Sequence, residues 1–300
     1  MNGTPTATAF RTGYLAIVGR PNVGKSSLMN RLVGAKVSIT SKKAQTTRHR
    51  IHGILTTDDR QYVFVDTPGL QTQHRNALNR AMNRAVSGAL ADVDVILFVI
   101  EAKRWLPEDA AVLARLPAGV PAILVINKVD RLADKAALLP FIAELAGRHD
   151  FAEIVPISAE RGENLDTLLQ VAGRYLPESA PIFAPDDLTD RSERFLAAEL
   201  LREKLFRNLG EELPYGIAVE IEKYEEADGV RRIHAAVIVD KEAHKSIVIG
   251  KGGERLKRVA SDARKDMERL FGGRVWLETW VKVKSGWADD ERALKSLGYE

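Results

Sequence analysis

Between residues 14 and 176, short apolar runs alternate with longer segments whose apolar residues recur at helical spacing. In chain order these pairs are YLAIVG and SSLMNRLVG, QYVFVD and ALNRAMNRAV, VDVILFVI and EDAAVLARL, VPAILVIN and KAALLPFIAELAGR, and EIVPIS and NLDTLLQVAGRYL. Repeated strand and helix predict an α/β domain with a doubly wound, mostly parallel sheet. Residues 50–57 predict a further strand, antiparallel to QYVFVD, with a turn at Asp58 and Asp59.

The alternation ends at Leu176, and Pro177, Pro181 and Pro185 follow closely. We place a linker at 177–190, because proline interrupts both helices and central strands. After it the pattern predicts an α+β domain in the order helix, strand, strand, helix, helix, strand, over residues 191–209, 215–224, 231–239, 241–248, 254–271 and 274–283. The expected organisation is a flexible leader at 1–12, a first domain at 13–176, a second domain at 191–284 and a tail at 285–300.

Composition excludes several classes of protein. The 300 residues include no cysteine, which removes disulfide frameworks, thiolate metal sites and cysteine nucleophiles. The apolar runs at 95–100 and 120–126 are far shorter than the roughly 20 residues of a membrane-spanning helix. Residues 1–12 lack the charged start and apolar stretch of a secretory signal. These features are compatible with a reducing, cytoplasmic compartment.

Positive charge is concentrated in one segment of the second half. The chain carries 44 Lys and Arg against 41 Asp and Glu, and residues 181–300 are net acidic. Within them, however, residues 241–284 hold 12 basic and 6 acidic side chains. Such a local excess of positive charge favours contact with a polyanion.

The run Gly19-Arg20-Pro21-Asn22-Val23-Gly24-Lys25-Ser26 fits the phosphate-loop pattern G-x-x-x-x-G-K-[ST] and lies between a predicted strand and a predicted helix. Its glycines let backbone N–H groups face the phosphates, so we expect all eight residues to line the phosphate site. Lys25 is expected to reach the β- and γ-phosphates, and the Ser26 hydroxyl to ligate Mg²⁺.

A second motif, Asp66-Thr67-Pro68-Gly69, begins at the end of the strand QYVFVD. At the carboxyl edge of the sheet, Asp66 is expected to hold a water of the Mg²⁺ shell, and the Gly69 N–H to contact the γ-phosphate. With Lys25 and Thr47 these residues form the expected catalytic group. Many such enzymes place a Gln directly after D-x-x-G to orient the attacking water, whereas this chain has Leu70, which cannot do so.

The polar, basic segment at 36–50 is typical of a loop that orders over Mg²⁺ and the γ-phosphate. Thr47, or its neighbour Thr46, would complete the Mg²⁺ shell. Asn22 in the phosphate loop is a candidate for holding a monovalent cation such as K⁺ beside the phosphates, in place of a positively charged finger.

Asn127-Lys128-Val129-Asp130 follows the strand VPAILVI and indicates guanine as the base. Guanine presents N1–H and N2–H₂ side by side, a donor pair that one carboxylate accepts, whereas adenine has an acceptor at N1. Asp130 is the expected acceptor, Asn127 would tie the base to the phosphate loop, and the Lys128 stem would cover the base. Ser158 and Ala159 supply a last loop, where the Ala159 N–H would donate to guanine O6. Four motifs in this order, each after a predicted strand, indicate a guanine-nucleotide-binding domain.

The second domain carries G-x-x-G at Gly250-Lys251-Gly252-Gly253, between two predicted helices. KH domains use a loop in this place to clamp the backbone of single-stranded nucleic acid. Arg255, Lys257 and Arg258 follow on the second helix and add positive charge. Together with the element order and the local charge, the loop favours RNA binding over a purely structural role.

On these motifs the chain closely resembles the Era family of bacterial GTPases, from about Tyr14 to its tail. The resemblance rests on GRPNVGKSSLMNRL, ITSKKAQTTRHRIHGI, DTPGL, NKVD, PISAE, ELPYGIAVEIE, VIGKGG and KVKSGWADDERALKSLGY. It implies a Mg²⁺-dependent, intrinsically slow GTPase domain followed by a type II KH domain. The KH domain would bind 16S ribosomal RNA near its 3′ end during maturation of the small ribosomal subunit.

The resemblance also implies a cytoplasmic protein, expected to be a monomer, that associates peripherally with the inner face of the cell membrane. Leu70 fits this family, which lies among GTPases that have an apolar residue in place of the catalytic Gln.

Two other interpretations compete with a GTPase that uses hydrolysis to time RNA binding. In the first, the protein is an RNA-binding assembly factor in which the nucleotide is mainly structural and hydrolysis is incidental. In the second it is a P-loop kinase, which conflicts with the NKVD motif and with the lack of a candidate acceptor site.

Overall fold

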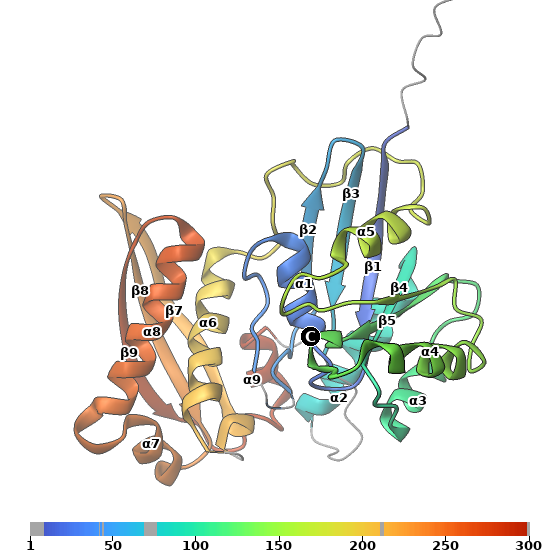
Figure 1. Ribbon diagram of the computed structural model, residues 1–300. Helices are drawn as coiled ribbons and strands as arrows, with labels where there is room; N and C mark the ends of the chain where they lie inside the picture. The colour runs from blue at the N-terminus through green and yellow to red at the C-terminus, as the bar shows by residue number, and fades with distance from the viewer. Residues whose placement is uncertain (1–8, 42, 44, 69–76, 211–212, 299–300) are drawn as a thin grey trace, which may run out of the picture. The chain divides into compact units, whose positions relative to one another are not determined.

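The computed structural model of the chain describes residues 9–41, 43, 45–68, 77–210 and 213–298 (Figure 1). By their contacts, the described residues divide into two compact units. Unit 1 is drawn from 1–34, 50–67 and 87–190, and unit 2 from 35–49, 68–86 and 191–300. Two segments from the first half of the sequence thus fold with the second half, which no division along the sequence predicts.

Unit 1 is built on a six-stranded sheet in the order β2-β3-β1-β4-β5-β6. Its strands are β1 (Arg11–Val18), β2 (Ile51–Thr56), β3 (Arg60–Asp66), β4 (Val95–Glu101), β5 (Ala122–Asn127) and β6 (Glu153–Pro156). β2 pairs antiparallel with β3, and all other neighbours in this sheet are parallel. This arrangement confirms the predicted α/β fold with a mostly parallel sheet, including its one antiparallel hairpin.

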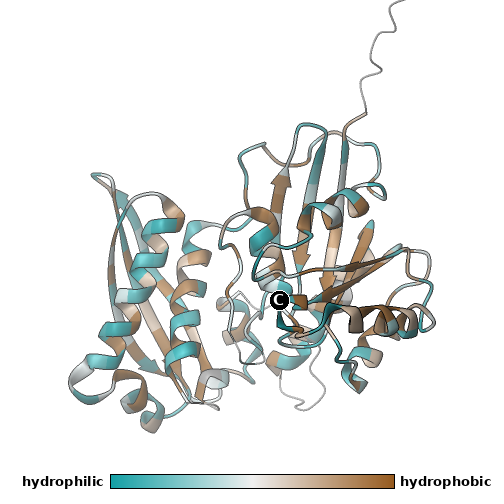
Figure 2. Ribbon diagram, viewed as in Figure 1, coloured by the Kyte–Doolittle hydropathy of each residue, from teal (hydrophilic) through white to brown (hydrophobic). Residues whose placement is uncertain are grey.

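The strands of unit 1 are apolar along most of their length. Most of β4 and β5 is coloured as hydrophobic in Figure 2. Residues 95–100 of β4 and 123–126 of β5 are fully buried, as is typical of parallel strands in a covered sheet. The helices of the first 176 residues are α1 (Lys25–Val33), α2 (Ala77–Ala91), α3 (Pro107–Leu113), α4 (Leu138–Ala146) and α5 (Leu165–Gly173), with short 3-10 turns η1 (Val129–Arg131) and η2 (Lys135–Ala137). The division between the units falls inside α2, after residue 86.

β1 begins at Arg11, three residues before the first apolar run, so the last two residues of the predicted leader belong to this strand. Arg11 lies opposite Arg60 in the sheet, and its guanidinium donates to the Leu176 carbonyl at 2.7 Å. The pattern misses this start because Arg11, Thr12 and Gly13 are held by their backbone and by polar contacts, without an apolar side chain.

Unit 2 has the predicted element order of a type II KH domain. Its elements are α6 (Glu193–Asn208), η3 (Leu213–Gly216), β7 (Ile217–Ala227), β8 (Val230–Val239), α7 (Glu242–Ile249), η4 (Lys251–Gly253), α8 (Glu254–Phe271), β9 (Arg274–Val283) and α9 (Glu291–Ser296). β7 and β8 are antiparallel, and β8 and β9 are parallel. The α+β second domain predicted from the sequence is therefore confirmed.

Both faces of the β7-β8-β9 sheet are used, because successive residues of a strand point to opposite sides. On one face, Val237 packs with Leu205 of α6 and Val259 of α8. On the other, Ile238 packs with Trp287 and with Leu294 of α9. The helix α9, which the sequence did not predict, is capped by Asp290, and the tail is thus an integral part of unit 2.

Candidate nucleotide site and RNA loop

The loop between β1 and α1 has glycine at two positions where a side chain would collide with fixed atoms. A Cβ at Gly19 would lie 2.2 Å from the Val99 carbonyl oxygen, and a Cβ at Gly24 would lie 2.3 Å from Asn127 Nδ2. Gly24 also caps the N-terminus of α1, where free N–H groups and the helix dipole attract anions. The loop therefore combines a tight turn with a helix start, as a phosphate site requires.

The Lys25 ammonium points into this loop. It donates to the carbonyls of Gly19 at 2.9 Å and Arg20 at 3.0 Å, and Lys25 is only 7% exposed. Burial lowers the pKa of Lys25 to about 8, and the carboxylate of Asp66 opposes part of this shift. A bound phosphate would pair with the ammonium and raise its pKa again.

A network of ion pairs joins the phosphate loop to the base loop. The Arg20 guanidinium donates to Asp109 at 3.1 Å and pairs with Glu101 at 3.2 Å. Glu101 also pairs with Lys128 at 3.2 Å, and Lys128 Nζ donates to the Asn22 carbonyl at 2.7 Å. Both carboxylates therefore hold the Arg20 guanidinium in pairs within the protein.

Sequence reasoning missed Glu101 and Asp109. Burial raises the pKa of Asp109, and the Leu106 N–H and Arg20 oppose this. Burial also acts to raise the pKa of Glu101, but Lys128 and Arg20 outweigh it and the pKa is lowered. Glu101 ends β4 at the carboxyl edge of the sheet, a position that signals a site. Asp109 gives no such signal, because a carboxylate that accepts an N–H in the first turn of a helix is an ordinary cap.

Asn127 connects three segments of unit 1. Its Nδ2 donates to the Val23 carbonyl at 2.8 Å, and its Oδ1 accepts from the N–H groups of Lys128 at 2.8 Å and Ala159 at 3.0 Å. The amide thus holds the end of β5, the phosphate loop and the loop after β6 together. The Ala159 N–H, our candidate donor to guanine O6, donates to Asn127 in this structure.

Asp130 presents a buried oxygen without a donor. It lies in η1, directly after Lys128, whose backbone is left-handed with φ 66°. The Oδ1 atom of Asp130 is buried and accepts no hydrogen bond from the residues that the structure describes. An unpaired buried carboxylate oxygen is costly, and an N–H donor from a ligand would satisfy it. Ser158, which precedes Ala159, is fully buried. Its Oγ accepts a hydrogen bond from the Arg161 N–H at 3.0 Å, and this bond closes a turn in the loop after β6.

Two of the Mg²⁺ candidates, Ser26 and Asp66, lie in unit 1. Ser26 is half-buried in the first turn of α1, and Asp66 is fully buried at the end of β3. Across the described ranges there is no cluster of three or more His, Asp or Glu residues that would hold a metal. One hydroxyl and one carboxylate fit Mg²⁺, which keeps several waters and takes phosphate oxygens as further ligands. Gly69 lies outside the described residues.

The other Mg²⁺ candidates, Thr46 and Thr47, are buried. They belong to segment 35–49, which is part of unit 2. The Thr46 hydroxyl donates to the Lys43 carbonyl at 2.7 Å. The Thr46 carbonyl accepts from Arg202 of α6 at 2.6 Å. The four candidates are therefore divided between the two units, and the choice between Thr46 and Thr47 stays open.

The G-x-x-G loop connects α7 to α8 through three glycines with positive φ, at Gly250, Gly252 and Gly253. Gly250 ends α7 and Gly253 caps α8, so the loop presents backbone at a helix N-terminus. Such a position suits a phosphate of a nucleic-acid backbone.

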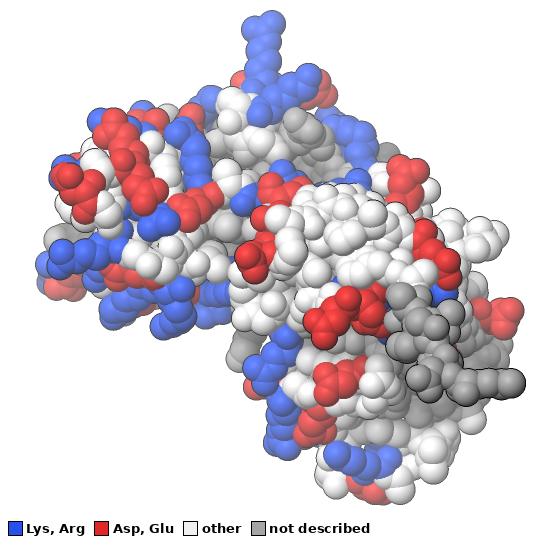
Figure 3. Space-filling view, turned by 90° about the horizontal axis from the view of Figure 1, so that it is seen from above, with Lys and Arg blue, Asp and Glu red and all other residues white. Residues whose placement is uncertain are grey.

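The cations around this loop are mostly free to face solvent. Lys251, Lys257 and Arg258 are exposed, whereas the half-buried Arg255 donates to the Ile247 carbonyl and braces the loop. On the face drawn in Figure 3, Lys and Arg side chains are interspersed with Asp and Glu. Three of the four charged RNA candidates are therefore exposed, and the fourth, Arg255, is half-buried.

Unit 1 has a phosphate loop at the start of α1 and, at Asp130, a carboxylate with a buried oxygen that has no donor, and these features place it among the P-loop GTPases. The strand order and the G-x-x-G loop of unit 2 are those of a KH domain. Comparison with known families agrees: residues 14–128 match the family model described as 50S ribosome-binding GTPase, and residues 212–288 match that of the KH domain.

Whole-chain relatives narrow this class. GTPase Era of Nitrosomonas eutropha is 59% identical over 295 residues, which are 98% of this chain and 100% of that protein. GTPase Era of Neisseria meningitidis serogroup A is 56% identical over 298 residues, 99% of this chain and 97% of that protein. The chain belongs to the Era family of GTPases.

Solved structures of this family have the same fold. An Aquifex aeolicus Era variant bound to GDP·AlF4⁻ is 42% identical and superimposes with a TM-score of 0.93, covering 97% of this chain and 99% of that one. Era in complex with MgGDPNP and nucleotides 1506–1542 of 16S ribosomal RNA gives the same identity, TM-score and coverage. The resemblance drawn from the sequence motifs is thereby confirmed.

Proposed function

We propose that this protein binds GTP with Mg²⁺, hydrolyses it to GDP and phosphate, and binds 16S ribosomal RNA through its KH domain while it assists maturation of the small ribosomal subunit. The observation that carries the nucleotide assignment is the buried Asp130 Oδ1 without a donor. The N1–H and N2–H₂ groups of guanine form a donor pair that the two oxygens of this carboxylate would accept. The RNA assignment is supported by the G-x-x-G loop and by the related Era solved with 16S nucleotides.

Hydrolysis in this proposal depends on charge stabilisation by the chain's own groups. Lys25 pairs with the β- and γ-phosphates, and the loop N–H groups, fixed by the glycines, face the same oxygens. Ser26, Asp66 through a water, and Thr47 would hold Mg²⁺. The metal supplies further neutralisation of charge on the phosphate oxygens. Gly69, which lies outside the described residues, would contact the γ-phosphate.

A monovalent cation would assist where the chain lacks a catalytic Gln. Asn22 lies in the phosphate loop with an exposed side chain, and its carbonyl is held by Lys128 Nζ at 2.7 Å. We therefore expect turnover to be faster in KCl than in NaCl, and Asn22→Ala to remove the difference. Equal turnover of the unmodified protein in the two salts would contradict a K⁺ site.

Single-turnover hydrolysis separates a switch enzyme from an assembly factor with a structural nucleotide. We expect [γ-³²P]GTP to be cleaved by the protein alone and the rate to change when a 16S fragment is added, because a switch couples its two ligands. The rate of phosphate release is measured with and without the fragment, and Gly252→Asp serves as the variant with a disrupted RNA loop. No cleavage in either condition would favour the assembly factor.

The remaining assignments follow the family. We propose that the protein works as a cytoplasmic monomer on the small subunit and associates peripherally with the inner face of the cell membrane. In the part of the chain that the structure describes, every helix is too short or too polar to cross a membrane. Sedimentation with and without vesicles tests both the monomer and the membrane association.

A further inference from the structure

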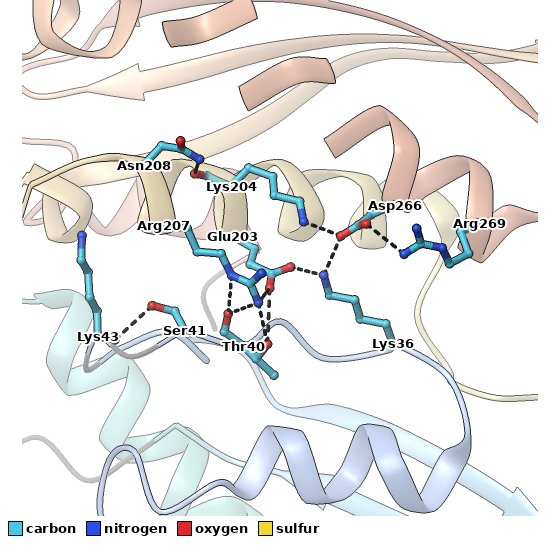
Figure 4. A network of polar contacts seen from close by, with 10 residues as sticks. All are labelled: Lys36, Thr40, Ser41, Lys43, Glu203, Lys204, Arg207, Asn208, Asp266 and Arg269. Atoms are coloured by element: carbon cyan, nitrogen blue, oxygen red, sulfur yellow. Dashed lines mark hydrogen bonds and ion pairs between the residues drawn. The ribbon is translucent and has the colours of Figure 1, made fainter. Parts of the chain in front are cut away.

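Segment 35–49 joins α1 to β2, yet its contacts belong to unit 2 (Figure 4). The same segment carries Thr46 and Thr47, the candidates for completing the Mg²⁺ shell. Its attachment to the KH elements is therefore of direct interest for the reaction.

Lys36 lies between two carboxylates that come from two different helices. Its ammonium pairs with Glu203 of α6 and, at 2.7 Å, with Asp266 of α8. The Glu203 side chain is fully buried and that of Asp266 is 12% exposed. Because α6 and α8 also pack together in the core of unit 2, one lysine binds a rigid pair of helices.

Each carboxylate also has a cation from the KH elements themselves. Glu203 pairs with Arg207, and Asp266 pairs with Lys204 at 2.5 Å and with Arg269 at 3.3 Å. A buried carboxylate left without a partner is strongly destabilising. Since both keep a partner without Lys36, the lysine can leave without stranding a charge, and its site is suited to reversible occupation.

The remainder of the segment follows α6 toward the candidate Mg²⁺ ligands. The Thr40 carbonyl accepts from the Arg207 guanidinium at 3.0 Å, Lys43 donates to the Gly210 carbonyl at 3.0 Å, and the Thr46 carbonyl accepts from Arg202 at 2.6 Å. These contacts reach α6, and Lys36 is the residue of segment 35–49 in Figure 4 that pairs both with Glu203 of α6 and with Asp266 of α8.

We propose that Lys36 is a positioning residue for the GTPase reaction, which fixes segment 35–49 to α6 and α8 through Glu203 and Asp266 and so couples nucleotide state to the RNA loop. Helix α8 begins at Glu254, 12 residues before Asp266, so a rigid element of about 18 Å connects the carboxylate to the G-x-x-G loop. Any shift of the segment on nucleotide binding then changes the free energy of RNA binding, and RNA changes nucleotide affinity by the same factor. This inference rests on the proposed function.

The test measures the coupling factor, defined as the ratio of Kd values for RNA with GDP and with GDPNP bound. The probe is an RNA of the 16S sequence 1506–1542, the segment present in the related complex. We expect a factor of about tenfold for the unmodified protein, in the usual range for coupled sites. Lys36→Met should bring the factor close to one, whereas Lys36→Arg, which keeps the charge, should retain it.

Arg269→Met is the matched control. Arg269 pairs with Asp266 from an exposed position and makes none of the contacts to segment 35–49 described above, so its loss should leave the factor at the unmodified value. Asp266→Asn removes the Lys36 pair from the other side and is used as well, so that a folding defect in one variant does not decide the result.

Three results are distinguishable. A factor that stays at the unmodified value in both Lys36→Met and Asp266→Asn overturns the inference. A factor of one in the unmodified protein, with both ligands bound, contradicts the inference while the proposed function stands. If the unmodified protein binds neither GDPNP nor the RNA, the proposed function is wrong and the inference falls with it.

Discussion

The nucleotide site and the RNA loop are built in opposite ways. At the nucleotide site, buried side chains fix the backbone of the surrounding loops. Asn127 makes three hydrogen bonds to backbone groups, and the buried Lys25 ammonium donates to the Gly19 carbonyl of the phosphate loop. At the RNA loop, glycines with positive φ supply the shape, and the cations Lys251 and Lys257 are exposed. A buried polar network is rigid and specific because each lost bond strands its partner, whereas exposed charges adapt and are screened by salt.

This difference suits the two ligands. A nucleotide is small and must be told apart from close analogues, which requires groups that are costly to leave unpaired. An RNA strand is long, and its binding sums many weak, salt-dependent phosphate contacts. Substitutions should therefore have large effects at the first site and small, graded effects at the second.

The largest effect is expected for Asn127→Ala. It leaves the Val23 carbonyl and two N–H groups without their partner, so we expect a loss of about 3 kcal/mol in the free energy of unfolding. Because the three segments that frame the nucleotide then separate, Kd for GDP should rise about a hundredfold. Denaturant unfolding and a fluorescent-nucleotide titration measure the two quantities.

Asn208→Ala is the control for that experiment, since Asn208 makes a single bond to the Lys204 carbonyl in the last turn of α6. It should cost less than about 1 kcal/mol and leave Kd for GDP unchanged. If both variants lost the same free energy of unfolding, the hydrogen bonds of Asn127 would matter no more than the single bond of Asn208, which would contradict the contrast drawn above.

An intermediate effect is expected from pH, through Lys25. The free protein holds the pKa of Lys25 at about 8, and a bound phosphate favours the charged form, so binding takes up a proton above that pH. Affinity for GDP should be nearly constant up to about pH 7.5 and weaken about fivefold between pH 8 and pH 9. Lys25→Arg stays charged and should show no such loss. A flat profile for the unmodified protein up to pH 9 would place the Lys25 pKa well above 8.

The smallest effect is expected at the RNA loop. Lys257→Ala removes one exposed cation, so RNA affinity should fall only about threefold, and the slope of log K against log salt should decrease by about 0.7. Lys282→Ala on β9, whose lysine pairs with Glu222, is the control and should leave the slope unchanged. A loss of a hundredfold for Lys257→Ala would show that the loop, like the nucleotide site, depends on single residues.

Most of the fold was predictable because its signals are local. Alternating apolar runs and helical segments identified the sheet of unit 1, and glycines at fixed spacing identified both loops. The charge network around Arg20 was not predictable, because Glu101 and Asp109 come from β4 and α3 and meet Arg20 only in the folded chain.

Helix α6 shows why the contacts of segment 35–49 with unit 2 could not be predicted from the sequence. Its apolar stripe predicts one buried face, but Glu199, Arg202 and Glu203 on its other faces are buried as well. Sequence patterns treat such charged residues as solvent-exposed, so the partners that bury them, among them Lys36, have no signal in the sequence.

The most direct test of the nucleotide assignment is the base preference of Asp130→Asn. The asparagine amide would donate to the O2 of xanthine while still accepting its N1–H, but it would meet the N2 amine of guanine with a donor. We predict that Kd for GTP rises by at least about a hundredfold and that XTP binds the variant more tightly than GTP. Asp134→Asn, at the exposed cap of η2, should leave both affinities unchanged. If Asp130→Asn binds GTP as the unmodified protein does, Asp130 is not the guanine acceptor and the account of this site is wrong.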